Sequence, residues 1–448
     1  MGYIIKNATL VNEGKTTLAS VVINGDKIGK IIFGKNDFSG GNVIDASGLY
    51  LMPGVIDEHV HFREPGLTQK ADISSESRAA VAGGVTSFME MPNTMPQTTT
   101  QELLKQKYDL ASRKSAANFA FYIGATNDNI EEITKTDPKM VCGIKLFMGS
   151  STGNMLVNED ETLVRLFKES PCLIAAHCED EQIIQANTLS YKDLASKGEV
   201  IADARLHPLV RTAEACYKST AKAVDMAAKH GAKLHVMHIS TKSELDLFRN
   251  DIPLKDKKIT AETCPHYLTF CDKDYEERGY AIKCNPAIKT ASDRSALRKA
   301  LSDGHIDTIG TDHAPHLWQE KFTDGYFTAK SGFPSIQNSL DLMLSLYHEG
   351  VVTLPQVVRL MCHNPAELYQ IKDRGFVREG YFADLVLVDL NQEKRIRNAD
   401  MLYKCGWTPY EGMTVKSQVT HTFVNGNLVY HDGVVEDNIF GKPLEFNR

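Results

Sequence analysis

Eight short apolar segments, separated by longer stretches with helical periodicity, limit most strongly how this chain can fold. We predict strands at residues 54–59, 86–91, 119–124, 143–147, 172–177, 233–238, 259–264 and 307–311. Strands that alternate with helices in this way are typical of βα units and a parallel sheet. Eight units favour an α/β fold of the TIM-type (β/α)8 barrel class, in which functional side chains stand at the carboxyl ends of the strands.

The two ends of the chain differ from this middle part. Short β-like runs at residues 3–5, 20–23, 28–32 and 43–45 are broken by glycine and asparagine, and similar runs return at 380–389 and 419–426. We expect the two ends to meet in one small, discontinuous β-sandwich domain made of residues 1–51 and 369–448, beside a barrel domain of residues 52–368. A chain of 448 residues is also long enough for two to three ordinary domains.

Charge and hydropathy exclude several classes of function. The net charge of −7 and the absence of a lysine and arginine stripe argue against nucleic-acid binding. No apolar run is long enough for a membrane span, and the first residues do not resemble a signal peptide, so we expect a cytoplasmic protein without membrane contact. Nine cysteines without a Cys-x-x-Cys pair fit reduced thiols.

A His-x-His pair ends the first predicted strand. In an extended strand His59, His61 and Arg63 share one face, while Val60 and Phe62 turn into the packing behind them. Two neutral imidazoles suit zinc or a similar metal, and a guanidinium suits a carboxylate. The open alternatives are an ordinary surface or core histidine pair, and an Arg63 that simply pairs with a neighbouring Glu64 or Asp57.

Polar residues also end four of the other predicted strands. They are Asn93 after the second, His177 on the fifth, His238 on the sixth and Asp312 on the eighth. Singly, His177 could cap a helix, His238 could be a core histidine with its hydrogen bonds made, and Asp312 could be an N-cap. Together, four histidines and a carboxylate at one end of a barrel exceed what a single structural zinc needs and predict a metal centre.

Lys145 ends the fourth predicted strand between apolar neighbours. Burial beside two divalent metals would depress its pKa, and the neutral amine can react with carbon dioxide to give a carbamate. The two carbamate oxygens could bridge two metal ions. A snorkelling or ion-paired lysine and a Schiff-base lysine remain the alternatives.

Four motifs together resemble the dihydroorotases of the amidohydrolase superfamily, and the resemblance spans nearly the whole chain. They are His59–Gly66 (HVHFREPG), Met91–Thr94 (MPNT), Glu262–Tyr267 (ETCPHY) and Gly310–His316 (GTDHAPH). The third motif by itself is shared with hydantoinases and allantoinases. The C-terminal Ala383–Val388 run fits the same family.

The resemblance implies a set of site residues. One zinc would be bound by His59, His61, Lys145 and Asp312, and a second by Lys145, His177 and His238, with a carbamylated Lys145 as the bridge. Arg63 and Asn93 would hold the substrate carboxylate, while Asn285 and His316 would complete the substrate site. Asp312 would also shuttle the proton.

Two segments depart from the family pattern. Many bacterial relatives carry an aspartate pair as the metal bridge shortly after the fourth strand, whereas residues 148–154 here contain no carboxylate. This favours the carbamylated lysine of the hydantoinase-like and eukaryotic members. The segment from Leu317 to Phe333 also differs, although Gly332 and Phe333, followed by Pro334, resemble a turn that contacts the substrate.

The activity implied by the resemblance is the reversible interconversion of N-carbamoyl-L-aspartate and (S)-dihydroorotate in de novo pyrimidine biosynthesis. Hydroxide generated at the metals would attack the cyclic amide, with Asp312 as the proton shuttle. The alternatives are a hydantoinase or dihydropyrimidinase, an allantoinase, and a scaffold that kept the fold without catalysis. By similarity to the family we also expect a homodimer.

Overall fold

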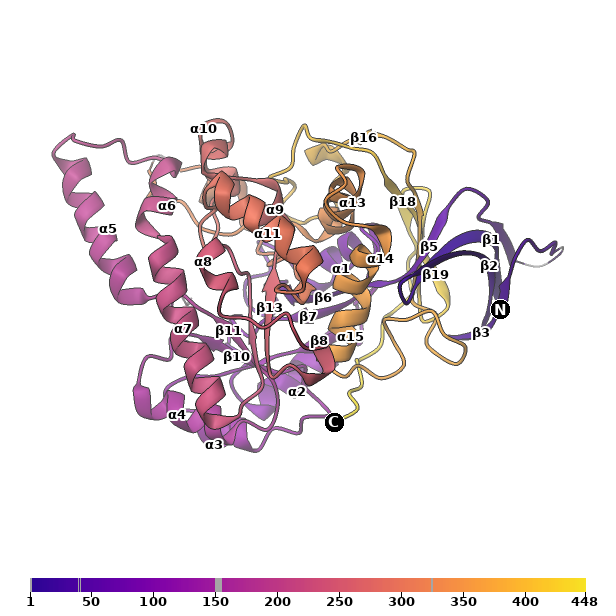
Figure 1. The fold of residues 1–448 in the computed structure, drawn as a ribbon, viewed down its shortest axis with the longest axis horizontal. Helices are drawn as coiled ribbons and strands as arrows, with labels where there is room; N and C mark the ends of the chain where they lie inside the picture. Colours follow the sequence, from indigo (N-terminus) through magenta and orange to yellow (C-terminus); the bar gives the residue numbers. More distant parts are fainter. Residues whose placement is uncertain (1, 39, 41, 150–154, 324) are drawn as a thin grey trace.

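The computed structural model describes residues 2–38, 40, 42–149, 155–323 and 325–448. Figure 1 shows an α/β body, in which helices surround a group of strands, and a β-rich part at one side that contains both the first and the last strands of the chain. The predicted site residues all belong to the α/β body.

Parallel strands form the centre of the α/β body. One sheet joins the strands β6-β7-β8, and a second sheet has the order β14-β13-β12-β11-β10-β9. Their bounds are β6 Val55–Val60, β7 Val85–Glu90, β8 Asn118–Phe121, β9 Ile123–Gly124, β10 Ile144–Phe147, β11 Ile174–His177, β12 Leu234–Val236, β13 Ile259–Thr263 and β14 Thr308–Ile309. All eight predicted strands are confirmed, and the third is divided at Tyr122 into β8 and β9.

A backbone contact links the first and last of these strands. Val60, at the end of β6, forms a parallel bridge with His313, which follows β14. The amide nitrogen of His61 donates to the carbonyl oxygen of His313 at 2.7 Å. The carboxyl ends of β6 and β14 therefore lie side by side, and this brings the first and the last of the predicted site motifs together.

Helices follow the strands, and several begin at a side chain that caps them. Asp72 accepts a hydrogen bond from Ser75 in a capping box before α1, and Thr290 does the same with Asp293 before α11. No helix in the described part of the chain is long and apolar enough to cross a membrane. The helix bounds are α1 Ile73–Ala82, α2 Gln101–Ala111, α3 Ile130–Thr134, α4 Asp160–Glu169, α5 Glu181–Ser196, α6 His207–Val210, α7 Ala213–His230, α8 Lys242–Leu245, α9 Pro265–Thr269, α10 Tyr275–Arg278, α11 Ala291–Asp303, α12 Trp318–Lys321, α13 Ser339–His348, α14 Leu354–Val358 and α15 Asn364–Leu368.

Two layers of apolar side chains hold the body together. Ile56, Ala175 and Met237 belong to one buried cluster, and Val60 and Phe62 belong to a second cluster that includes residues of the surrounding helices. Burying such a side chain contributes about 1.5 to 3 kcal/mol. The packing of Val60 and Phe62 away from the site agrees with the sequence prediction.

The β-rich part is one nine-stranded mixed sheet. Its order is β20-β19-β18-β15-β5-β1-β2-β3, and β4 pairs with β1. The strands are β1 Tyr3–Asn12, β2 Lys15–Asn24, β3 Lys27–Phe33, β4 Asn42–Asp45, β5 Tyr50–Pro53, β15 Leu385–Asp389, β18 Gln418–Val424, β19 Asn427–His431 and β20 Val434–Val435, with β16 Lys394–Arg395 and β17 Thr414–Val415 as a separate pair. The two chain ends therefore meet, as predicted. The two-layer form of a sandwich remains a prediction.

The first strand is longer than the sequence pattern predicts. The sequence pattern predicts a short run at residues 3–5, but β1 continues to Asn12. Asn7 adopts a φ of 59°, and the register with β2 shifts between Ile5 and Ala8. A β-bulge at Asn7 thus lets the strand continue through an asparagine, a residue type that in sequence patterns often marks the end of a strand.

The last residues of the chain return to the α/β body. Pro443 forms a parallel bridge with Phe119 in β8. The guanidinium of Arg448 donates to the carbonyl oxygens of Cys142 and Tyr369, each at 2.8 Å. The C-terminal segment therefore packs against the strands rather than only on the β-rich part.

Candidate active site

A cavity of about 470 Å³ opens at the carboxyl ends of the parallel strands. All of the predicted site residues except Phe333 line it: His59, His61, Arg63, Asn93, Lys145, His177, His238, Asn285, Asp312, His316 and Gly332. They come from segments more than 270 residues apart in the sequence, and the fold brings them to one place.

Three donors of the cavity converge on one point. The Nε2 atoms of His59 and His61 lie 3.3 and 3.1 Å from Oδ1 of Asp312. His59, His61 and Asp312 form a group whose donor atoms all lie within 4.8 Å of one another. Two imidazoles and a carboxylate at this spacing are a donor set suited to a divalent transition metal.

The outer ring nitrogens of these histidines are held by the protein. Nδ1 of His59 lies 2.8 Å from Oε1 of Glu262, and Nδ1 of His61 lies 2.7 Å from Oδ1 of Asn93. Because both oxygens accept, each Nδ1 carries the proton, which leaves each Nε2 lone pair directed at the site. Glu262 and Asn93 thus fix the tautomer that a metal ligand needs.

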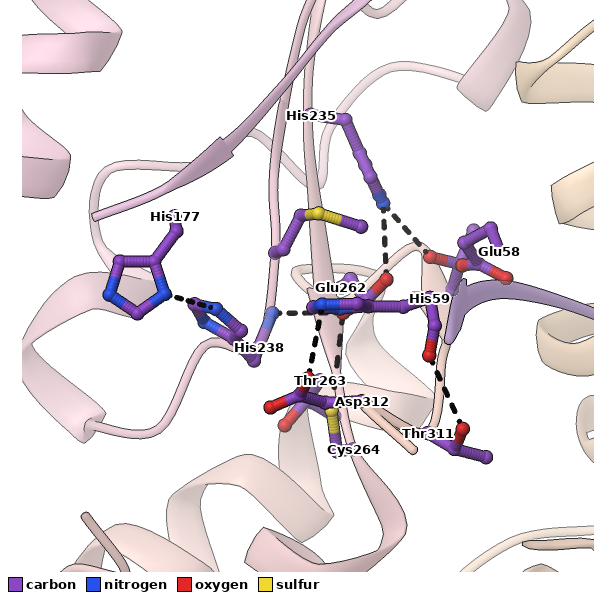
Figure 2. Close-up of polar contacts among 12 residues, drawn as sticks. Glu58, His59, His177, His235, His238, Glu262, Thr263, Cys264, Thr311 and Asp312 are labelled. Atoms are coloured by element: carbon purple, nitrogen blue, oxygen red, sulfur yellow. Dashed lines mark hydrogen bonds and ion pairs between the residues drawn. The ribbon is translucent and has the colours of Figure 1, made fainter. Parts of the chain in front are cut away.

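In the second pair of histidines, His177 is also held by a carboxylate through one of its ring nitrogens. Nε2 of His177 lies 3.0 Å from Oε2 of Glu179, which also pairs with Arg211. Nδ1 of His177 faces Nε2 of His238 at 2.8 Å (Figure 2). Since Nε2 of His177 donates to Glu179, its Nδ1 carries the lone pair and accepts from Nε2 of His238, so these two nitrogen atoms lie together at one point of the site.

Lys145 lies on β10 and is buried, with 1% of its surface exposed. Its Nζ lies 2.9 Å from the sulfur of Met237 and 4.8 Å from the centre of the Phe147 ring. Burial lowers the pKa of Lys145 from 10.5 to about 8. No carboxylate of the described chain is within ion-pair distance of it, which excludes the ion-paired alternative.

Three site residues adopt left-handed backbone conformations. The φ angles are 67° for Arg63, 44° for His238 and 47° for Asp312. Such angles are uncommon for residues other than glycine and cost about 1 to 3 kcal/mol where they are strained. Strain of this kind clusters at functional sites, because surrounding contacts hold the residue in place.

Burial makes the site favour uncharged imidazoles. It lowers the pKa of His59 to about 3 and of His61 to about 4. Burial alone would raise the pKa of Asp312, but the neighbouring His59 and His61 hold it below its ordinary value. Near neutral pH the cavity therefore contains neutral imidazoles beside an ionised carboxylate, the protonation states that metal ligands require.

Arg63 lies on the cavity wall beside these donors. Its Nε donates to the carbonyl oxygen of Pro315 at 3.1 Å. Asp57 instead accepts from Thr311, and Glu64 pairs with Lys114 at 2.7 Å. Within the described residues no carboxylate forms an ion pair with Arg63, so the alternative of a structural pair with Asp57 or Glu64 is wrong.

His316 stands next to this guanidinium. Its Nδ1 accepts from Nζ of Lys70 at 3.1 Å, and its Nε2 lies 3.0 Å from the carbonyl oxygen of Ser331. The tautomer that satisfies both contacts carries its proton on Nε2. The 3.3 Å approach of Arg63 Nη2 to that atom is then a contact and not a hydrogen bond, since both atoms are donors.

Two further predicted residues complete the wall, and one lies behind it. Oδ1 of Asn285 is buried without a hydrogen-bond partner in the described chain, so it can accept from a ligand. Gly332 has a φ of 115°, and a Cβ there would lie 2.8 Å from the carbonyl oxygen of Ala314. Phe333 instead packs its ring against His266, so we expect its side chain to support the wall.

Two lysines hold the loop that follows α12. Nζ of Lys321 is buried and donates to the carbonyl oxygens of Lys283 at 2.6 Å, Gly332 at 2.7 Å and Lys330 at 3.2 Å. Nζ of Lys283 in turn donates to the carbonyl oxygens of Tyr326 and Ala329. The segment from Leu317 to Phe333, apart from residue 324, is thus tied to the cavity wall.

Sequence reasoning missed several residues of the site. Glu262 and Glu179 orient metal-ligand candidates, and Lys70, Lys283 and Lys321 organise the opposite wall. Only Glu262 had a usable signal, because it stands at a strand end inside a recognised motif. The family departure at residues 150–154 lies outside the described residues.

Comparisons with known proteins agree with this geometry. The amidohydrolase family matches residues 50–429. A dihydroorotase from Methanosarcina mazei is 34% identical over 98% of this chain and 95% of that protein, and an allantoinase from Bacillus velezensis is 32% identical over 96% and 94%. The solved L-hydantoinase (dihydropyrimidinase) from Arthrobacter aurescens superposes with a TM-score of 0.92 at 28% identity, covering 99% of both chains.

Proposed function

Because the chain belongs to the amidohydrolase family, we propose that it is a metal-dependent dihydroorotase, a hydrolase of cyclic amides. It interconverts N-carbamoyl-L-aspartate and (S)-dihydroorotate in pyrimidine biosynthesis. The dihydroorotase relatives support this activity, and so does the shape of the cavity, in which a candidate metal centre faces a cationic wall.

One observation carries the choice of substrate. Arg63 is 7% exposed and has no carboxylate partner in the described chain, yet its guanidinium lines the cavity. A buried, unpaired guanidinium is costly unless a ligand supplies the anion. The ring carboxylate of dihydroorotate supplies it, and the side-chain nitrogen of Asn93, whose oxygen is used by His61, adds a donor.

The donor set fits a pair of divalent metals, and we propose zinc. His59, His61 and Asp312 would hold one ion, and His177 and His238 the other, with a carbamylated Lys145 between them. The fit rests on the Nε2 atoms of His59 and His61 beside Asp312, on the 2.8 Å approach of His177 Nδ1 and His238 Nε2, and on the neutral amine that burial favours at Lys145. When bound, such ions lower the pKa of water and polarise an amide carbonyl.

The chain's own residues divide the remaining work. Arg63 and Asn93 fix the substrate carboxylate, and Oδ1 of Asn285 accepts a hydrogen bond from the ring. Asp312 takes a proton from the attacking water and returns it to the leaving ring nitrogen, the shared acid and base duty that one positioned carboxylate can perform. In ring closure Asp312 instead deprotonates the ureido nitrogen.

A second candidate is hydantoinase or dihydropyrimidinase activity, favoured by the close superposition with the L-hydantoinase. Allantoinase activity has support from the Bacillus velezensis relative. These uncharged rings would leave Arg63 buried beside no anion, which weakens their binding. A scaffold without catalysis is disfavoured because all six candidate metal ligands are present.

A substrate panel tests the proposal. Zinc-supplemented protein is incubated with dihydroorotate, dihydrouracil, hydantoin and allantoin in parallel, and ring opening is followed by ultraviolet absorbance or product release. We expect rapid, chelator-sensitive turnover of dihydroorotate alone. Turnover of an uncharged ring in its place would assign the chain to one of the alternative activities, and inactivity on all four rings with bound zinc would favour the scaffold.

The wider architecture adds three proposals. We infer that the eight parallel strands close into a TIM-type barrel, supported by the bridge between Val60 and His313. The barrel domain would span residues 52–368, with residues 1–51 and 369–448 as a β-sandwich domain. A homodimeric, cytoplasmic enzyme is the form we expect from the family.

A further inference from the structure

A second group of buried donors lies close to the candidate metal centre. Glu58 on β6, His235 on β12 and Glu262 on β13 have donor atoms within 4.8 Å of one another. All three side chains are completely buried. Figure 2 shows His235 pointing toward Glu262, with Glu58 on the right of the view and His177 on the left.

Three of the four carboxylate oxygens in this group lack a hydrogen bond in the described chain. Both oxygens of Glu58 and Oε2 of Glu262 are buried without a hydrogen bond in the described chain. The other Glu262 oxygen is used, since Oε1 accepts from Nδ1 of His59 at 2.8 Å and from the amide of His238 at 3.0 Å. Buried polar atoms without partners are rare in folded proteins, and three in one place require an explanation.

The hydrogen bonds of His235 show which atom it presents to these oxygens. Oγ1 of Thr260 lies 3.3 Å from the carbonyl oxygen of Leu234, to which it donates, so it accepts from Nδ1 of His235 at 2.8 Å. The ring proton is therefore on Nδ1, and Nε2 is left as a lone pair. That atom faces Oε2 of Glu262.

Three acceptors thus converge without enough donors. The hydroxyl of Thr308 lies 3.3 Å from Nε2 of His235 and also lies near Glu58, but it has only one proton to donate. The distance of 3.9 Å between Nε2 of His235 and Oε2 of Glu262 is too long for a hydrogen bond. It suits two ligands on either side of a metal ion, because each bond to such an ion is about 2.0 to 2.2 Å long.

No lysine or arginine in the described part of the chain forms an ion pair with these carboxylates. Lys145 donates to the sulfur of Met237 and, among the described residues, is not within ion-pair distance of Glu58 or Glu262. An isolated buried carboxylate is strongly disfavoured unless it is paired, protonated or bound to a metal. A divalent cation would compensate both carboxylates at once.

We propose that Glu58, His235 and Glu262 bind a third divalent metal ion, of the first-row transition series, buried beside the candidate catalytic centre. One imidazole and two carboxylates suit zinc, manganese, iron or cobalt. Through Glu262 this ion also orients His59, because one oxygen of Glu262 holds the ion and the other holds Nδ1 of His59. The ion is structural, since the three ligands have no exposed surface.

Metal content tests the proposal without any activity assay. The protein is produced in medium supplemented with zinc, desalted, and analysed for metal per chain. The variant His235→Phe removes the nitrogen ligand and keeps a ring beside Tyr369. We expect it to contain one equivalent less than the unmodified protein. Equal metal content in the two proteins, with similar melting temperatures, would overturn the proposal.

The variant His363→Phe is the matched control. His363 is also a buried histidine with hydrogen bonds, to the amide of Glu13 and to the carbonyl oxygen of Gly375, but it lies outside both donor groups. It should retain the metal content of the unmodified protein. A loss of one equivalent here too would mean that the His235 result reflects a general loosening, and would remove its support.

Anomalous diffraction from crystals of the unmodified zinc-loaded protein decides the matter if His235→Phe does not fold. We expect a peak between Nε2 of His235 and the free oxygens of Glu58 and Glu262, separate from any peak at the cavity. A map with peaks at the cavity and none at this position would show that the two carboxylates are compensated by protons, and would refute the third site. This outcome does not depend on which ring the enzyme opens.

Discussion

The two walls of the cavity are built on different principles. On one wall the candidate metal ligands His59, His61 and Asp312 come from strand ends and are oriented by Glu262 and Asn93. On the other wall Arg63 and His316 lie on segments after the strands, and buried lysines fix the loop beside them. Strands place the first set, whereas loop contacts place the second.

This difference predicts a division of labour. The metal-ligand wall holds the groups for amide hydrolysis that any cyclic-amide hydrolase needs. The other set of lining residues holds the cations that select a carboxylated ring. Substitutions on the first wall should therefore reduce turnover of every substrate, while substitutions on the second should change which substrate is bound.

The largest effect should follow from Asp312→Ala. Loss of the proton shuttle should lower kcat by about 1000-fold, because general acid and base catalysis commonly contributes about 100 to 10000-fold. The measurement is steady-state turnover of dihydroorotate, with the metal content of the variant determined in the same preparation. Near-normal turnover in a metal-loaded variant would exclude Asp312 as the shuttle.

A smaller and selective effect is expected from Arg63→Met. Removing one partner of a buried charge pair costs about 2 to 5 kcal/mol, so kcat/KM for dihydroorotate should fall by about 100-fold, mainly through KM. Any slow turnover of dihydrouracil should not fall, since that ring has no carboxylate. Parallel loss on both substrates would contradict the division between the walls.

The sequence located the metal-ligand wall more completely than the other. Strand ends and the spacing of His59, His61, His177, His238 and Asp312 carry a strong signal, because barrel geometry converts position along a strand into position in space. No comparable rule relates the sequence positions of Lys70, Lys283 and Lys321 to their places in the folded protein. Lys283 and Lys321 depend on the carbonyl oxygens that a folded loop presents to them, and Lys70 depends on the position of His316, which no local pattern encodes.

The alternation of side-chain direction along β6 also did not predict the position of every side chain. It places Glu58 on the face of Val60, away from His59. The register with β7 shifts between Asp57 and Val60, and Asp57 accepts from the amides of His59 and Thr311. The carboxylate of Glu58 lies near His235 on β12 and Glu262 on β13, and His59 contacts Glu262. The irregularity arises from contacts with distant strands, so it could not be read from the segment alone.

An intermediate effect is expected from pH during metal loading. Burial lowers the pKa of Lys145 to about 8, below its value in the unfolded chain, so the neutral amine that reacts with carbon dioxide becomes abundant as pH rises through 8. With the concentration of dissolved carbon dioxide held equal at both pH values, activation of metal-free protein by zinc should be about eight-fold faster at pH 8.5 than at pH 7. A pH-independent rate would argue against carbamylation, and Lys145→Ala should not activate at either pH.

The smallest effect should come from Lys321→Met, which tests whether the loop wall is held by this one ammonium. The variant leaves the carbonyl oxygens of Lys283, Gly332 and Lys330 without their donor, while the side chain keeps nearly the same length. Because Gly332 and Lys283 line the cavity beside His316, the wall should loosen and KM for dihydroorotate should rise about five-fold, a loss near 1 kcal/mol. The metal-ligand wall is untouched, so kcat should stay within about two-fold.

The exposed Lys299→Met on α11 serves as the matched control and should change neither constant. A fall in kcat at unchanged KM would mean that the two walls are mechanically coupled, and that the separation between binding and turnover drawn from their construction does not hold.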